Sequence, residues 1–261
     1  MKNPKIAVIL AGRRASGDVI EAETGHHKAF LEFDGTSAIT RVLKALKGVT
    51  SIKEAWIIAP EDLSKEFSEI DIEGIITSVL PAADGPSQSL LNVFQQVSKG
   101  DSLLVTTCDL PLLTTEIVST FVNGIADDVD VAAGVVTRQV YEAAYPNTRR
   151  TYIKFRDISF SGANLFYFDP IAADPLMQFW RQLEDNRKQP LKMAAQIGVL
   201  TGLKYSLGML TKSDAVQAII GKTGVRAGFV ELPEAKAAID VDKMEDIATV
   251  REIFEAKKEK P

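Results

Sequence analysis

The chain has little of two residue types that metal and catalytic sites often use. Its 261 residues include one cysteine, Cys108, and two histidines, His26 and His27. One cysteine cannot form an intramolecular disulfide, and the same count excludes metal sites built on paired cysteines. A zinc site would need carboxylates to complete it. We therefore expect the histidines to be structural or solvated, and the cysteine count is compatible with a reducing compartment.

Long hydrophobic runs and an excess of positive charge are also missing. Residues 1–10 contain two lysines and then an apolar run that is too short for a secretory signal or a membrane span. The formal net charge is −5, whereas general affinity for nucleic acid rests mainly on basic groups. We therefore expect a cytoplasmic protein with no membrane and no nucleic-acid partner, in which any phosphate site is local.

Short apolar runs, partly β-branched, recur along the first half of the chain and are typical of buried strands. Between them, apolar residues fall on one face of two expected helices. The expected strands are residues 6–10, 55–59, 75–80, 102–107 and 129–136, and the expected helices are 37–46 and 87–97. This alternation predicts a three-layer α/β/α fold with a mostly parallel, Rossmann-like sheet, in which ligands bind beyond the carboxyl ends of the strands.

The rhythm changes after about residue 138, and we expect an insertion at about 138–170. Because no glycine- or serine-rich linker follows, we expect one domain, 1–261, with an elaborated edge. The segments that we expect to be structured are strand-like at 151–155, 164–168, 226–232 and 237–241 and helical at 244–256. The hydrophobic stretch 155–168 could pack against a second subunit, which allows a homo-oligomer.

The loop after the first expected strand is rich in small and basic residues. It continues from Leu10 as Ala11-Gly12-Arg13-Arg14-Ala15-Ser16-Gly17-Asp18. Small residues let backbone N–H groups approach an anion closely, and arginines add charge-assisted contacts, which is how a triphosphate would be held. An ordinary turn is the alternative, because the loop matches neither common glycine-rich phosphate motif.

Two further residues are candidates for chemistry. Lys28 heads an apolar run that leads to a likely turn at 34–35, and a solvated lysine at a strand edge is its alternative. Asp109 follows the strand at 102–107, so it stands at a carboxyl end, where a carboxylate can hold Mg²⁺ beside phosphates. Its alternative is a cap that closes the turn before Leu110-Pro111.

The chain resembles a known family in four segments taken together, which are LAGRR, HKAFLEFDGTSAITRVLKAL, VTTCDLPLL and IDVDKMEDIATV. These segments resemble the nucleotidyltransferases that include the molybdenum cofactor guanylyltransferases, called MobA-like, and the sugar-phosphate and methylerythritol-phosphate cytidylyltransferases. The resemblance implies transfer of a nucleotide monophosphate from a nucleoside triphosphate to a phosphorylated small-molecule acceptor, with release of pyrophosphate and with Mg²⁺ as cofactor. A glycosyltransferase-like enzyme that uses a nucleotide-sugar and a non-catalytic nucleotide-binding protein are the alternatives.

The resemblance also implies roles for particular residues. It implies catalytic roles for Arg14, Lys28 and Asp109, and it implies that Asp109 and Asp242 hold the metal. The residues that it places at the nucleotide are Leu10, Ala11, Gly12, Arg13, Ser16, Gly17, Ser87 and Ser89. The loop lacks the usual arginine-methionine-glycine ending, so the choice between Arg13 and Arg14 as the triphosphate contact stays open.

Alternatives remain for the later positions. Asp240 is the other candidate for the second metal ligand, and Asp242 with Glu245 three residues later also fits the start of a helix. Ser87 follows Pro86 at an expected helix start, which explains it locally. The expected insertion concentrates positive charge, and the acceptor is expected to bind Arg150, Lys154 and Asn164. A solvated basic hairpin is the alternative there.

Overall fold

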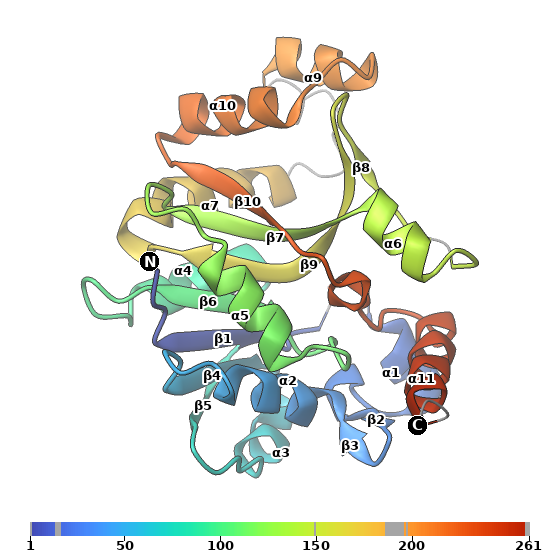
Figure 1. Cartoon of the computed structure of the whole chain (residues 1–261). Coiled ribbons are helices and arrows are strands. Elements are labelled where there is room, and N and C mark those ends of the chain that lie inside the picture. Colours follow the sequence, from blue (N-terminus) through green and yellow to red (C-terminus); the bar gives the residue numbers. More distant parts are fainter. Residues whose placement is uncertain (1, 14–16, 149, 186–195, 197, 259–261) are drawn as a thin grey trace.

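A computed structural model describes residues 2–13, 17–148, 150–185, 196 and 198–258. Its eight-stranded sheet consists of β1 (Ile6–Leu10), β4 (Glu54–Ala59), β5 (Ile76–Pro81), β6 (Leu103–Thr107), β7 (Val131–Thr137), β8 (Ile153–Lys154), β9 (Ser159–Phe168) and β10 (Ala227–Glu231). A separate ribbon pairs β2 (Glu32–Phe33) with β3 (Thr36–Ser37). The order in the sheet is β10-β7-β9-β6-β1-β4-β5, and β8 pairs with β9 outside this path (Figure 1).

The helices are α1 (Val19–Thr24), α2 (Ala38–Lys47), α3 (Ser64–Ser68), α4 (Pro86–Phe94), α5 (Thr115–Asn123), α6 (Arg138–Ala144), α7 (Pro170–Asp185), α9 (Val199–Ser206), α10 (Lys212–Thr223) and α11 (Met244–Lys258). The described residues also form three short 3-10 turns, which are η1 (Lys28–Phe30) between α1 and β2, η2 (Glu61–Leu63) after β4 and η3 (Ala235–Ala238) between β10 and α11. Within the described residues, no helix combines the length and apolar character needed to span a membrane.

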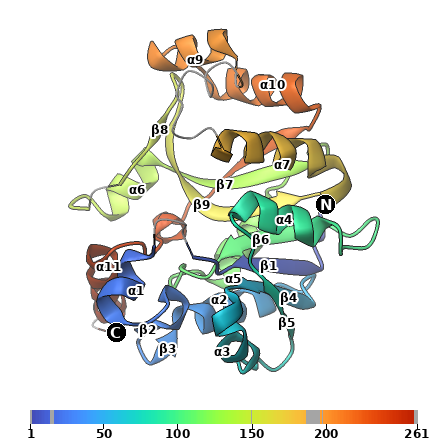
Figure 2. The same cartoon turned by 180° about the vertical axis from the view of Figure 1, so that it is seen from behind.

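The strands next to β1 are buried on both faces. β1 pairs in parallel with β4 and β6, and residues 6–9 of its sequence IAVIL are buried. Helices α2 and α5 cover one face, and α4 and α7 cover the other (Figures 1 and 2). Because covered parallel sheets need apolar side chains on both faces, these strands are continuous apolar runs. The predicted three-layer fold is confirmed.

Helix α2 shows how the sequence sets one of these layers. Ser37 caps the helix by accepting the backbone N–H of Thr40, and the buried side chains include Val42 and Leu46 on the core face. After the helix, a Cβ atom at Gly48 would lie 2.0 Å from Oγ1 of Thr115 in α5. Only glycine therefore allows the close approach of α2 and α5 at this point.

Two features of the second half differ from the sequence predictions. The expected insertion supplies α6, β8 and β9, but β9 lies inside the sheet, antiparallel to both β6 and β7, and not at an elaborated edge. The strand expected at 237–241 is wrong, because 235–238 form η3 and the following residues lead to α11. The strand expected at 226–232 is β10, which rejoins the sheet beside β7.

Candidate active site

The loop after β1 lies at the carboxyl edge of the sheet. The N–H of Ala11 donates to the carbonyl of Ile58, so the pairing with β4 extends one residue beyond β1. A Cβ atom at Gly12 would lie 3.5 Å from that of Ala82, which brings the loops after β1 and β5 together. The loop after β1 thus meets, at Gly12 and Ala82, the loop that leads to Ser87 and Ser89, while Arg14 and Ser16 fall outside the described residues.

Arg13 is held by two carboxylates. It donates to both oxygens of Glu21 in α1, at 2.8 and 2.7 Å, and to Asp62 in η2 at 2.6 Å. Hydrogen bonds from these carboxylates hold the pKa of Arg13 above its usual range. Arg13 thus ties the loop after β1 to the loop after β4, a role that the sequence did not indicate.

Lys28 is buried next to the first expected metal ligand. The residue begins η1, whose first turn is fixed by the buried His27, because Nδ1 of His27 accepts the N–H of Ala29 at 3.3 Å. Lys28 is 8% exposed and Asp109, just after β6, is 4% exposed. The alternative of a solvated lysine is therefore wrong.

One ammonium group joins two carboxylates that are far apart in the sequence. Nζ of Lys28 donates to Oδ2 of Asp109 at 2.5 Å and to Oδ1 of Asp242 at 3.1 Å. The other oxygen of Asp109 accepts from the hydroxyl of Thr107, at 2.5 Å. The structure therefore brings together Lys28, Asp109 and Asp242, as the sequence predicted, and it adds Thr107.

Burial and charge act in opposite directions in this cluster. Burial lowers the pKa of Lys28, but the carboxylates of Asp109 and Asp242 outweigh it and hold that pKa above its usual value. Burial also raises the pKa of Asp109, although Lys28 and Thr107 favour the ionised form. Lys28 therefore stays protonated at neutral pH, and its charge compensates carboxylates that are costly to bury.

Asp242 is positioned by backbone contacts and by a neighbouring side chain. The N–H of Val241 donates to the carbonyl of Asp109 at 3.0 Å, which holds this segment against the end of β6. Oδ2 of Asp246 accepts the backbone N–H groups of Asp242 and Lys243, both at 2.9 Å. Asp246, in the first turn of α11, therefore holds the segment that leads into the helix, and the expected pairing of Asp242 with Glu245 is wrong, because the N–H of Asp242 donates to Asp246.

Asp240 has different partners. Its Oδ1 accepts from Nη1 of Arg150 at 2.7 Å, and its Oδ2 accepts from Nδ2 of Asn164 at 3.1 Å. Nε of Arg150 also donates to Ser161 in β9, at 2.9 Å. Two of the three residues predicted to bind the acceptor, Arg150 and Asn164, are thus brought together through one carboxylate.

Asn164 reaches this carboxylate because β9 bulges. Ala133 of β7 pairs with Phe166, and Val135 pairs with Gly162, so one residue of β7, Gly134, faces three residues of β9. Asn164 lies within this bulge and has a left-handed backbone, with φ of 48°. Bulges redirect side chains. A left-handed backbone at asparagine costs conformational free energy, and residues of this kind are often found at functional sites.

The remaining residues predicted to contact the nucleotide or the acceptor lie in α4 and in β8. Ser87 and Ser89 are buried at the start of α4, and Oγ of Ser89 accepts the N–H of Ala83, which shapes the loop after β5. Lys154 is exposed in β8, and within the described residues no hydrogen bond or ion pair links its side chain to the carboxylates. The structure does not bring Lys154 into the cluster.

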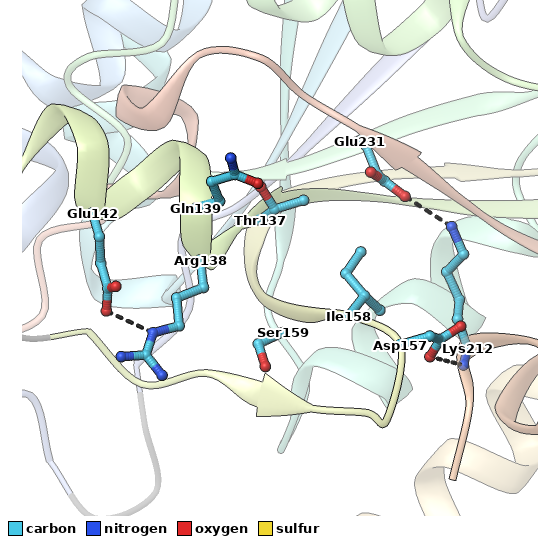
Figure 3. A pocket seen from close by; sticks show the side chains of 9 residues that line it. All are labelled: Thr137, Arg138, Gln139, Glu142, Asp157, Ile158, Ser159, Lys212 and Glu231. Atoms are coloured by element: carbon cyan, nitrogen blue, oxygen red, sulfur yellow. Dashed lines mark hydrogen bonds and ion pairs between the residues drawn. The ribbon is translucent and has the colours of Figure 1, made fainter.

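A pocket of about 660 Å³ lies apart from these residues (Figure 3). It opens between the end of β7, the hairpin of β8 and β9, the start of α10 and the end of β10. Its walls are polar, and two ion pairs lie within them, Arg138 with Glu142 and Lys212 with Glu231. None of the predicted site residues lines this pocket.

The carboxylates fit a hard divalent cation bound together with phosphates. Among the described residues, no three histidine, cysteine or acidic side chains form a cluster that could hold a metal alone. Mg²⁺, however, is usually bound by one or two carboxylates, several waters and substrate phosphates. Asp109 and Asp242, which share one ammonium group, are two carboxylates of this kind at the carboxyl edge of the sheet.

Comparison with known proteins assigns the family. Residues 7–200 match the model of the MobA-like NTP transferase domain. The chain belongs to this family. A solved structure described as a hypothetical transferase from Thermus thermophilus is 26% identical, has a TM-score of 0.78 and covers 95% of this chain and 100% of its own.

Of two further similarities, one covers less of the chain and the other has a lower identity. A probable molybdenum cofactor guanylyltransferase from Clostridium perfringens is 27% identical over 127 residues, which are 49% of this MobA-like chain and 57% of that protein. The match thus spans little more than half of the curated relative. The 4-diphosphocytidyl-2C-methyl-D-erythritol synthase from Anaerococcus prevotii, with 12% identity, a TM-score of 0.56 and coverage of 97% and 100% of the two chains, shows the shared fold.

Proposed function

We propose that this MobA-like chain is a Mg²⁺-dependent nucleotidyltransferase that transfers a nucleotide monophosphate from a nucleoside triphosphate to a phosphorylated small-molecule acceptor and releases pyrophosphate. We also propose that residues 1–261 form a single nucleotidyltransferase domain. The main support is the contact of Lys28 with both Asp109 and Asp242. These three residues come from η1, the end of β6 and the start of α11, and they meet where parallel sheets bind ligands.

In the proposed reaction, an oxygen of the acceptor phosphate forms a bond to the α-phosphorus of the triphosphate. The bond from that phosphorus to the bridging oxygen of the β-phosphate breaks, and pyrophosphate leaves with the electron pair. A phosphate oxygen is already ionised near neutral pH, so no histidine base is needed. Alignment of the two substrates can therefore supply much of the acceleration.

Different residues of the chain would bind the metal, offset the developing charge and contact the triphosphate. Asp109 and Asp242 would hold Mg²⁺, which neutralises phosphate charge and polarises the reacting phosphoryl group when bound. The ammonium group of Lys28 would offset the charge that develops on the α-phosphoryl group and pyrophosphate. The backbone of Leu10, Ala11, Gly12 and Gly17 would contact the triphosphate.

Arg14 is the arginine that we propose for the leaving phosphates. Arg13 already binds Glu21 and Asp62, so a contact with the triphosphate would have to compete with two carboxylates. We propose that Ser16, Ser87 and Ser89 complete the nucleotide site. The acceptor would lie on the other side of the carboxylates, at Arg150 and Asn164, with Lys154 at its outer edge.

The direct test is pyrophosphate release from each of the four nucleoside triphosphates with a panel of phosphorylated acceptors, with and without Mg²⁺. Asp109→Asn should lower the rate by about 100-fold or more, because it removes charge at the reacting phosphates. Asp71→Asn, which changes an exposed carboxylate, should leave the rate unchanged and is the matched control. A rate that is the same in Asp109→Asn and the unmodified chain would exclude the metal role.

A further inference from the structure

Two aspartates that are two positions apart serve different partners. Asp240 and Asp242 flank Val241, whose N–H is fixed to the carbonyl of Asp109. Asp242 accepts from Lys28, whereas Asp240 accepts from Arg150 and Asn164. The short segment 240–242 thus joins the cluster of Lys28 and Asp109 to the residues that come from the loop before β8 and from β9.

We propose that Asp240 is the positioning residue of the acceptor subsite and not a metal ligand. Each of its two oxygens accepts a hydrogen bond, at 2.7 Å from Arg150 and at 3.1 Å from Asn164. Asp109 and Asp242 share the ammonium group of Lys28, whereas both donors to Asp240 are residues expected at the acceptor. Asp240 can have this role only if the chain is the nucleotidyltransferase proposed above.

The contacts of Arg150 show what Asp240 would position. Nε donates to Ser161 and Nη1 donates to Asp240, so two bonds from different atoms fix the plane of the guanidinium group. Within the described residues, Nη2 of Arg150 makes no hydrogen bond, so it remains available as a donor. An oriented guanidinium group binds phosphate oxygens well, because its donors match their geometry.

Asn164 provides the second fixed point. Its left-handed backbone and the bulge of β9 direct its amide to Asp240. Nδ2 of Asn164 donates one hydrogen bond to that carboxylate. The side chains of Arg150 and Asp240 are 19% and 18% exposed, so the pair is accessible to a ligand at one side. The chemical class that fits this subsite is a phosphate monoester, bound through one or two of its oxygens.

The test compares two matched variants, Asp240→Asn and Asp242→Asn. Asp240→Asn keeps the shape but replaces a carboxylate that accepts twice by an amide that accepts at one atom. We expect its KM for the phosphorylated acceptor to rise about 10-fold, since about one charge-assisted hydrogen bond is lost. Its affinity for a Mg²⁺–nucleoside triphosphate should change less than twofold, whereas Asp242→Asn should weaken that affinity about 10-fold.

A second measurement does not depend on turnover. The ¹⁵N NMR signal of Nε of Arg150, assigned with Arg150→Lys, should be visible in the unmodified chain and shift when inorganic phosphate is added. In Asp240→Asn that signal should move or broaden, and phosphate should bind about 10-fold more weakly.

Three outcomes are distinguishable. An unchanged Arg150 signal and an unchanged phosphate affinity in Asp240→Asn would overturn the positioning role. Weakening of Mg²⁺–nucleotide binding in Asp240→Asn to the extent seen in Asp242→Asn would make Asp240 a metal ligand and would overturn it too. If the unmodified chain bound no Mg²⁺–nucleotide, the proposed function would fail and Asp240 would have no acceptor to position.

Discussion

The ion pairs Lys28–Asp109 and Arg226–Asp130 are both 2.5 Å long, but they lie at opposite ends of the sheet. Arg226 and Asp130 join the beginnings of β10 and β7, whereas Lys28 and Asp109 lie at the carboxyl end of β6. The side chains of Lys28 and Asp109 are 10% and 6% exposed, while that of Arg226 is 58% exposed. The pair Arg226–Asp130 thus keeps its positive charge in water, whereas the pair Lys28–Asp109 buries both of its charges.

The difference between these pairs indicates which of them serves a ligand. Burying both charges of an ion pair costs more desolvation free energy than burying one of them. The attraction between the two buried charges often fails to offset that cost. A fold that needed only to tie two strands could use the exposed arrangement of Arg226 and Asp130. The buried group of Lys28, Asp109 and Asp242 is better explained as a site prepared for charged substrates.

The largest expected effect on stability is that of Lys28→Met. This change leaves the carboxylate of Asp109 buried without its ammonium partner, which should lower the free energy of unfolding by about 3–5 kcal/mol. Urea unfolding at neutral pH measures it. A loss as small as that of an exposed pair would show that the buried pair carries no special cost.

The loss of stability in Lys28→Met should also depend on pH. Burial raises the pKa of Asp109, and without Lys28 the main opposing influence is gone. Because the folded variant then holds its proton more tightly than the unfolded chain, the loss of stability should develop as the pH rises from 3.8 through the raised pKa. Unfolding curves at a series of pH values should show the variant approaching the unmodified chain at the acidic end of this interval.

Asp130→Asn should have an intermediate effect. Asp130 accepts from the backbone N–H, Nε and Nη2 of Arg226, and its loss should lower the free energy of unfolding by about 1–2 kcal/mol. Hydrogen bonds from Arg226 lower the pKa of Asp130, so its contribution is present above pH 3.8 and disappears as the pH falls through the lowered pKa. Binding of Mg²⁺–nucleotide should not change, which separates this pair from the buried one.

Arg138→Gln should have the smallest effect. Arg138 and Glu142 lie one helical turn apart, at 2.7 Å, with side chains that are 51% and 43% exposed. Exposed pairs of this kind contribute about 0.5 kcal/mol or less, so unfolding should hardly change. A loss comparable with that of Asp130→Asn would show that burial does not order these three pairs.

The sequence predicted best where local patterns and chemistry agree. The apolar runs of β1, β4 and β6 are confirmed because strands covered on both faces must be apolar. Lys28, Asp109 and Asp242 meet in the structure because the carboxyl end of β6 and the segment before α11 converge at one edge. Their roles toward metal and nucleotide stay predictions.

The sequence predicted less where partners are distant. The central position of β9 depends on its pairing with β6 and β7, which local periodicity does not contain. Residues 237–241 look strand-like, but 235–238 form a 3-10 turn in the structure, because local propensity does not decide whether a segment finds a pairing strand. The contacts of Arg13 with Glu21 and Asp62 and of Arg150 with Ser161 and Asp240 likewise follow from tertiary structure. No capping-box pattern signals the contacts of Asp246, because the residue three positions before it is Lys243 and not serine or threonine.

The most direct test of the central claim is calorimetric titration of a nucleoside triphosphate into the unmodified chain and into Asp109→Asn, with and without Mg²⁺. If Lys28, Asp109 and Asp242 converge on a metal-bound polyphosphate, Mg²⁺ should strengthen binding in the unmodified chain and have little effect in Asp109→Asn. Equal binding in all four titrations would contradict the account.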